Sequence, residues 1–183
     1  MIPRIIFAHG NDTEHWSGSW AHWLKNELGK RGYPTFFETF PDSIMARAKY
    51  WIPFLGDHIK AGENDVIVGW SSGAVAAMKY TEIHRLFGSI LISPSATDGG
   101  DELEEQSGYY DTPWNWDAIK KNQERIDLIY SDDDPYIPQS EFELIGDKLG
   151  ATVHKLSGKK HFIGDPTFRE LLDVITKQYP VDK

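Results

Sequence analysis

The sequence predicts an α/β protein in three layers, with about six parallel strands between two layers of helices. Short apolar runs rich in β-branched residues alternate with longer amphipathic segments along the chain. This alternation is typical of a parallel sheet covered by helices on both faces. The length of 183 residues suits one ordinary domain, so we expect a single domain over residues 1–183.

The strands are predicted from short apolar runs that end at turn-forming residues. Val66, Ile67 and Val68 are all β-branched, and Gly10 and Pro41 close two other runs. We expect strands at residues 4–9, 35–40, 65–70, 88–93, 125–131 and 151–156. In a sheet of this kind, ligands bind at the carboxyl ends of the strands.

The helices are predicted from apolar residues at helical spacing. Trp20, Trp23, Leu24 and Leu28 fall on one face of the first such segment, which is the pattern of a helix packed on a core. Pro53 predicts a kink within the second segment. We expect helices at residues 19–30, 43–60, 72–84, 139–148 and 167–179.

Composition and charge exclude several classes of protein. The chain has no Cys, which excludes a Cys nucleophile, a disulfide framework and a thiolate metal site. Its net charge of −9 has the wrong sign for a nonspecific binder of nucleic acid or of an anionic membrane. The N-terminal residues lack a signal-peptide pattern, and no apolar run approaches a membrane span. We therefore expect a cytoplasmic protein.

The pentapeptide Gly69–Trp70–Ser71–Ser72–Gly73 matches the Gly-x-Ser-x-Gly pattern of a nucleophile elbow. It lies between a predicted β-branched strand and a predicted helix, which is the context that the elbow requires. The two glycines would remove side chains that collide across a sharp turn, and Ser71 would be the nucleophile. The alternative is that small residues merely ease the packing of helix on strand; the context favours the elbow.

A serine nucleophile needs a base, and the base needs a carboxylate to orient it. Asp132, Asp133 and Asp134 directly follow the fifth predicted strand, and His161 follows the sixth. Asp134 is the preferred acid because it opens an Asp-x-x-Ile-Pro stretch that leads into a helix, with Asp133 second and Asp132 third. The order Ser, acid, His is the order of this architecture.

The oxyanion of the reaction needs two backbone N–H donors. Ser72 would supply one, and the loop after the first strand, His9–Gly10–Asn11–Asp12, would supply the other. We assign this second donor to Asn11, with Asp12 as the alternative. The remaining histidines form no closed ligand set and no Gly-rich phosphate loop is present, so no metal and no cofactor is predicted.

Residues 94–122 interrupt the alternation, because they show no strand run and no clean helical period. A long loop inside a compact domain commonly carries a function, and we interpret this segment as a lid insertion. Its aromatic residues predict an apolar or aromatic substrate pocket. Together with two Trp outside the lid, the predicted pocket residues are Trp16, Trp70, Tyr109, Tyr110, Trp114 and Trp116.

An acidic run within the predicted lid allows two interpretations. Asp101, Glu102, Glu104 and Glu105 could attract a substrate with a positive charge, such as a free amine. They could also form a solvated surface, and from the sequence alone we favour this second interpretation.

Four stretches together resemble one known family. They are residues 69–74, Ser107–Tyr110 with Pro113 and Trp114, Asp133–Pro138, and Gly158–Phe162. They are similar to the small α/β-hydrolase-fold serine hydrolases typified by retinoblastoma-binding protein nine and bacterial YdeN-like proteins, and the likeness covers nearly the whole chain. The resemblance implies a compact α/β-hydrolase of six parallel strands, without the usual first two antiparallel ones. It also implies a triad of Ser71, Asp134 and His161.

The sequence departs from this family at two points. Lys159 and Lys160 precede His161, where a short Gly-His-Gly linkage is commoner. A Leu-x-Cys-x-Glu partner motif is impossible without Cys, so no retinoblastoma-type partner is expected, and no other protein partner is predicted.

The function predicted from these residues is hydrolysis of a small-molecule ester or amide, as in carboxylesterases or aminopeptidases, with no nucleic acid or membrane as partner. The alternative is a noncatalytic protein-interaction module on a hydrolase scaffold, but such a module would not require all three triad residues. A nucleotide-binding domain is disfavoured because no Gly-rich phosphate loop is present.

Overall fold

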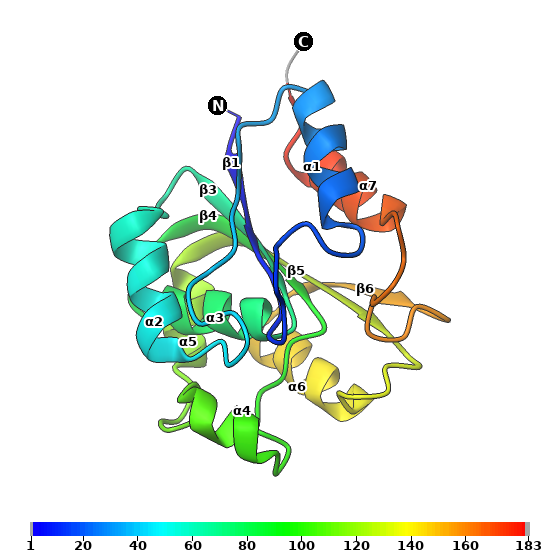
Figure 1. The fold of residues 1–183 in the computed structure, drawn as a ribbon. Coiled ribbons are helices and arrows are strands. Elements are labelled where there is room, and N and C mark those ends of the chain that lie inside the picture. Colours follow the sequence, from blue (N-terminus) through cyan, green and yellow to red (C-terminus); the bar gives the residue numbers. More distant parts are fainter. Residues whose placement is uncertain (1, 182–183) are drawn as a thin grey trace.

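The computed structural model describes residues 2–181. Its six strands form one parallel sheet in the order β2-β1-β3-β4-β5-β6. The strands are β1 (Arg4–Ala8), β2 (Thr35–Phe37), β3 (Asp65–Trp70), β4 (Leu86–Ile92), β5 (Gln123–Ser131) and β6 (Thr152–Leu156). The predicted fold class is confirmed: six parallel strands lie between two layers of helices (Figure 1).

The helices divide between the two faces of the sheet. The first layer holds α1 (Ala21–Lys30) and α7 (Arg169–Gln178), which lie side by side in Figure 1. The second layer holds α2 (Ala48–Pro53), α3 (Ser72–Thr81), α5 (Trp116–Lys121) and α6 (Gln139–Leu149). Within residues 2–181, no helix is both long enough and apolar enough to cross a membrane.

Strand residues alternate between the two hydrophobic clusters that these layers form. Val66 and Val68 of β3 pack with α1 and α7, whereas Ile67 packs with α3. All three side chains are fully buried. Successive strand side chains point to opposite faces, and both faces are covered, so the strand shows a continuous apolar run instead of an alternating one.

The segment predicted as one helix over 43–60 is divided in two. Helix α2 begins only at Ala48, and after Pro53 the chain continues as a π-helical turn, η1 (Phe54–His58). Pro53 has no N–H to donate and its ring crowds the preceding turn, while the N–H of Ile59 donates to the carbonyl of Phe54 at 2.9 Å. The predicted irregularity at Pro53 is therefore a change of helix type.

Two short helices lie in the segment 94–122, where no helical period was predicted. They are α4 (Glu102–Ser107) and α5. Asp101 caps α4 by accepting the N–H groups of Leu103 and Glu104, and Asn115 caps α5 by accepting the N–H of Ala118. Side-chain caps stabilise such short helices without a long amphipathic pattern, so periodicity alone missed them.

The strand order places a crevice beside β1. The chain passes from β1 to β2 on one side, and then returns to place β3 on the other side of β1. The loops that leave β1 and β3 therefore diverge at the carboxyl edge of the sheet, where open α/β sheets bind their ligands. Ser71 follows β3 and the His9–Asp12 loop follows β1, so both lie at this crevice.

Candidate active site

Ser71 occupies a sharp turn between β3 and α3. Its backbone has φ 54° and ψ −123°, a conformation that costs a non-glycine residue about 1–3 kcal/mol. The neighbouring glycines permit the turn: a Cβ at Gly73 would lie 2.0 Å from the carbonyl oxygen of Ala8, and one at Gly69 would lie 2.5 Å from that of Gly73. The turn is therefore the nucleophile-elbow geometry, with Ser71 at its apex.

His161 and Asp134 form a buried hydrogen-bonded pair. His161 Nδ1 lies 2.8 Å from Asp134 Oδ2, and their side chains are 7% and 1% exposed. The hydroxyl of Ser93 donates to the same Oδ2 at 2.9 Å, and the N–H groups of Tyr136 and Ile137 donate to Oδ1. The carboxylate is thus held by four donors from three segments of the chain.

These donors determine the charge state of Asp134. Burial opposes its ionised form, but the hydrogen bond and charge of His161 and the two backbone N–H groups outweigh burial, so the pKa of Asp134 is lowered. An ionised carboxylate at Nδ1 leaves Nε2 of the imidazole as the nitrogen that can accept a proton.

The other two aspartates of the predicted triplet have different partners. Asp132 accepts from the hydroxyl of Ser157 at 2.8 Å, and Asp133 accepts from Ser131 and from the N–H of Lys160. Of the three predicted candidates, the structure brings only Asp134 to His161.

Trp70 connects the elbow to the histidine loop. Its indole Nε1 donates to the backbone carbonyl of His161 at 3.0 Å. On another side, the ring of Tyr136 meets the His161 ring edge to face at 5.1 Å. Because Trp70 directly precedes Ser71, the same peptide segment positions both the serine and the histidine.

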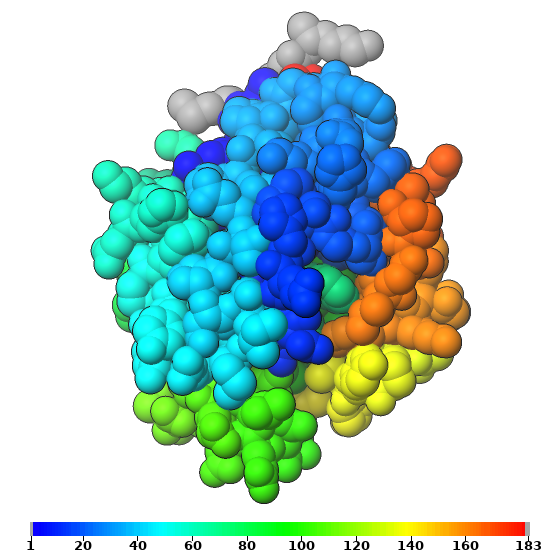
Figure 2. Space-filling view, viewed as in Figure 1, coloured from blue at the N-terminus to red at the C-terminus, as the bar shows by residue number. Residues whose placement is uncertain are grey.

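Ser71 and His161 line one cavity of about 730 Å³. In Figure 2, a hollow lies between the dark-blue segment after β1 and the orange segment after β6. Within residues 2–181 the hydroxyl of Ser71 makes no hydrogen bond, either to His161 or to another group. The observation that associates Ser71 with His161 is therefore that both side chains line the same cavity.

The predicted oxyanion donors also line this cavity. Asn11 and Ser72 are both lining residues, and their backbone N–H groups have no hydrogen-bond partner within the described residues 2–181. Ser72 is the first residue of α3, where helical N–H groups have no partner inside the helix. The alternative donor, Asp12, gives its N–H to the carbonyl of Ile44 at 3.1 Å, so it is not available.

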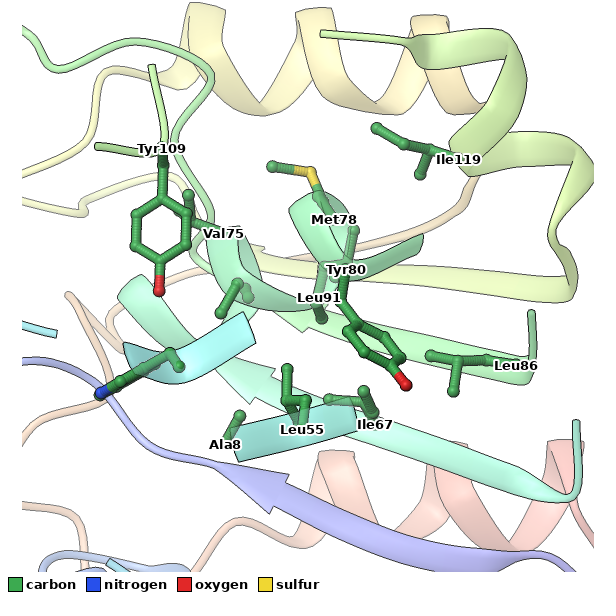
Figure 3. Close-up of a cluster of buried hydrophobic side chains, with 14 of the residues drawn as sticks. Ala8, Leu55, Ile67, Val75, Met78, Tyr80, Leu86, Leu91, Tyr109 and Ile119 are labelled. Carbon is green, nitrogen blue, oxygen red and sulfur yellow. The ribbon is translucent and has the colours of Figure 1, made fainter. Parts of the chain in front are cut away.

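Five of the six predicted pocket residues lie away from the cavity lining. Trp70 is a lining residue, but the other five are not: Trp16, Tyr109, Tyr110, Trp114 and Trp116. Tyr109 is fully buried and enters the hydrophobic cluster beside Val75 of α3 (Figure 3). Contrary to the predicted pocket, these five residues therefore do not line the cavity that holds Ser71 and His161.

The remaining four aromatics have structural contacts that explain their positions. The hydroxyl of Tyr110 lies 2.7 Å from that of Ser95, and the indole N–H of Trp114 donates to the carbonyl of Ala96. Trp116 packs on Trp114 at 5.6 Å, and Trp16 packs on Phe37. These four side chains are half-buried against the two hydrophobic clusters of the protein.

Acidic residues take the place predicted for the aromatics. Five carboxylates from three regions of the chain line the cavity, and none of its lining residues within 2–181 is Lys or Arg. These five are Asp12, Asp98, Asp101, Glu104 and Glu141. Asp101 and Glu104 belong to the acidic run that we interpreted as solvated, whereas Asp98 and Glu141 carried no sequence signal. Exposed apolar side chains also line it: Leu103, Tyr136 and Ile163.

Glu104 is one of the half-buried members of this acidic group. One of its oxygens accepts from the side-chain amide of Asn11 at 3.2 Å. Burial, with a smaller contribution from Asp101, raises the pKa of Glu104. In the described part of the chain, His, Asp and Glu side chains form no group of three that could hold a metal ion.

Comparisons with known proteins identify a family that the chain resembles over most of its length. The serine hydrolase family profile matches residues 7–176. The chain is 38% identical over 157 residues to the serine hydrolase RBBP9 of Rattus norvegicus, which is 85% of this chain and 84% of that protein.

Two solved structures are similar in fold. The ydeN gene product of B. subtilis matches with a TM-score of 0.87 at 21% identity, over 98% of this chain and 100% of that one. Carboxylesterase CesB (YbfK) of Bacillus subtilis matches with a TM-score of 0.65 at 14% identity, over 97% and 83% of the two chains. At these identities the likeness shows a shared fold.

Proposed function

The chain belongs to the serine hydrolase family, as its motifs predicted, and from this premise we propose that it cleaves a small ester or amide through an acyl-enzyme on Ser71. The observation that carries the proposal is the buried 2.8 Å contact between His161 and Asp134, beside a strained serine that lines the same cavity.

The proposed reaction begins with proton transfer. Nε2 of His161 takes the proton of the Ser71 hydroxyl as the Oγ bonds to the substrate carbonyl carbon, and the carbonyl π electrons move to oxygen. When the oxyanion collapses, the bond to the leaving group breaks and His161 gives its proton to that group. Water then attacks the acyl-enzyme with His161 as base, and Ser71 regains its proton as the acid product leaves.

The other groups stabilise charge that appears during these steps. Asp134, whose pKa is lowered, holds the imidazole in one tautomer and stabilises the imidazolium. The free N–H groups of Asn11 and Ser72 would bind the oxyanion. Each such donor typically raises kcat by a factor of about 10²–10³. No step needs a metal or an organic cofactor.

Replacement of the nucleophile tests this function. We expect Ser71→Ala to lower kcat for a p-nitrophenyl ester by about 10⁴ or more, because the acyl-enzyme can no longer form. Ser89→Ala is the matched control: Ser89 is buried in β4, its hydroxyl has no partner within residues 2–181, and it lies outside the cavity lining. Near-wild-type activity in Ser71→Ala would instead favour a noncatalytic module.

The lining of the cavity supports a substrate with a positive charge and an apolar part. Five carboxylates without a Lys or Arg among the lining residues within 2–181 give the cavity a field that attracts cations. Leu103, Tyr136 and Ile163 are 55%, 66% and 60% exposed and offer apolar contact at the same cavity. This lining favours an aminopeptidase-like over a neutral carboxylesterase-like substrate.

A pair of esters tests the preference for charge. We expect an aromatic amino-acid ester with a free amine to have a kcat/KM at least tenfold above that of its N-acetylated form, because acetylation removes the cation. The ratio should fall with added salt, since screening weakens the attraction. Equal kcat/KM for the two esters would rule out a role of the acidic lining in substrate choice.

A further inference from the structure

We propose that His9 is a positioning residue, whose imidazole fixes the plane of the Gly10–Asn11 peptide so that the Asn11 N–H faces the oxyanion. The inference rests on the proposed hydrolysis at Ser71. His9 itself is not a lining residue of the cavity, so it would act through the backbone of its neighbours and not on the substrate.

His9 is held in the core directly after β1. It is 1% exposed, and its ring packs edge to face on Phe40 at 5.4 Å and on Trp51 at 5.1 Å. A polar ring in such a place is costly unless its nitrogens are hydrogen-bonded. Both nitrogens of His9 have a partner.

The two partners determine the tautomer. The backbone N–H of Phe40 donates to Nε2 at 2.8 Å, so Nε2 must carry a lone pair. The proton is therefore on Nδ1, which donates to the carbonyl of Gly10 at 2.7 Å. Burial lowers the pKa of His9, which favours this neutral ring.

The hydrogen bond to Gly10 fixes the next N–H in the chain. The Gly10–Asn11 peptide is trans, and in a trans peptide the C=O and the following N–H point in opposite directions. Since the Gly10 carbonyl turns toward the buried ring, the Asn11 N–H turns away from it, toward the cavity that Gly10 and Asn11 line. This N–H has no partner within residues 2–181.

The same peptide lies against the nucleophile. A Cβ placed on Gly10 would be 3.4 Å from Cβ of Ser71 and 3.9 Å from its hydroxyl oxygen. Glycine gives the backbone wide freedom, so without the ring this peptide could rotate. Rotation would turn a carbonyl oxygen toward the oxyanion and replace attraction by repulsion.

Two substitutions of His9 test this role. His9→Phe retains an aromatic ring among Phe40 and Trp51 but removes both hydrogen bonds. We expect kcat to fall by about 10²–10³, the effect of losing one oxyanion donor, with KM changed less than threefold. The glutamine of His9→Gln carries an amide N–H that can donate to the Gly10 carbonyl and a carbonyl that can accept the Phe40 N–H. We therefore expect the kcat of His9→Gln to be at least tenfold higher than that of His9→Phe.

Trp51→Phe is the matched control for damage to the cluster. It removes the hydrogen bond from the Trp51 indole to the carbonyl of Pro41, and it leaves the Gly10 peptide untouched. We expect a lower Tm with kcat within threefold of wild type. A boronic acid that forms a tetrahedral adduct on Ser71 should bind His9→Phe more weakly than wild type, by the same factor as the fall in kcat. Its affinity for Trp51→Phe should be unchanged.

The following results would overturn the inference. A folded His9→Phe with kcat within threefold of wild type would do so, as would a folded His9→Gln that recovers nothing. If His9→Phe does not fold, ¹⁵N NMR of the wild-type protein can show which nitrogen of the His9 imidazole carries the proton. A proton on Nε2 instead of Nδ1 would contradict the proposed role. Different results would overturn the proposed function itself: a wild-type protein that hydrolyses no ester or amide, or a Ser71→Ala variant that keeps its activity.

Discussion

Three consecutive aspartates have different hydrogen-bond partners, and we therefore expect them to differ in function. Asp132 and Asp133 bind hydroxyl and backbone groups of the neighbouring loop, whereas Asp134 lies 2.8 Å from His161. At this scale the role of a residue follows from its hydrogen bonds, which a run of identical residues in a sequence does not reveal.

Replacing the orienting carboxylate should disable catalysis without removing the nucleophile. We expect Asp134→Asn to lower kcat by about 10³–10⁴, because an amide can hold the imidazole in the wrong tautomer. The matched control is Asp132→Asn, two positions away and exposed, which should change kcat less than threefold. Equal losses in the two variants, measured with the same ester, would show that Asp134 has no special role.

Glu104 should make stability depend on pH. Its pKa is raised in the folded protein, first by burial, so its contribution to stability is fully present below the unfolded value of about 4.3 and is lost as pH rises through the folded pKa. Glu104→Gln stays neutral at every pH. We expect its Tm to exceed that of wild type at pH 7, and the gap to close near pH 4.

Glu102→Gln is the control for this measurement. Glu102 is exposed on the same helix and does not line the cavity, so its variant accounts for the loss of one charge from α4. A gap for Glu104→Gln that is independent of pH would contradict the raised pKa.

The elbow is the element in which backbone geometry matters most. A Cβ at Gly73 would meet the Ala8 carbonyl oxygen at 2.0 Å, whereas one at Gly29 of α1 would meet nothing within 4 Å. Gly73→Ala should therefore lower the free energy of unfolding by about 3 kcal/mol or more. Gly29→Ala should raise it by about 0.5–1 kcal/mol, since alanine favours a helix.

Urea unfolding of the two glycine variants checks this contrast. Both variants replace a helical glycine with alanine, and the two sites differ in the space that the structure leaves for the new Cβ. Two variants of equal stability would mean that the close approach at the elbow is not needed.

Elements were predicted well where the apolar pattern is set by burial on both faces of the sheet. All six strands and the elbow helix α3 follow from runs such as Val66–Val68 and from the small residues after Ser71. The short helices α4 and α5 were missed because their caps, Asp101 and Asn115, stabilise them locally. The break at Pro53 was predicted, but its π-helical form depends on one carbonyl of Phe54.

The arrangement of the whole molecule explains why the sequence could place Ser71, Asp134 and His161 at one edge of the sheet, but could not place the predicted aromatic residues. Ser71, Asp134 and His161 each follow a strand, and parallel strands bring such positions to one edge. No comparable rule says which face of the 94–122 segment turns inward. Its aromatics pack on the α3 side, with Tyr109 fully buried, so the acidic residues of the segment meet the cavity instead.

The proposed hydrolysis requires Ser71 to be an activated nucleophile in the folded chain. Incubation with a fluorophosphonate, followed by mass spectrometry of the digested protein, measures this most directly. We expect one adduct per chain on Ser71, lost in Ser71→Ala and kept in Ser89→Ala. A folded wild-type protein that forms no adduct, or that carries it on another residue, would show that Ser71 is not the nucleophile.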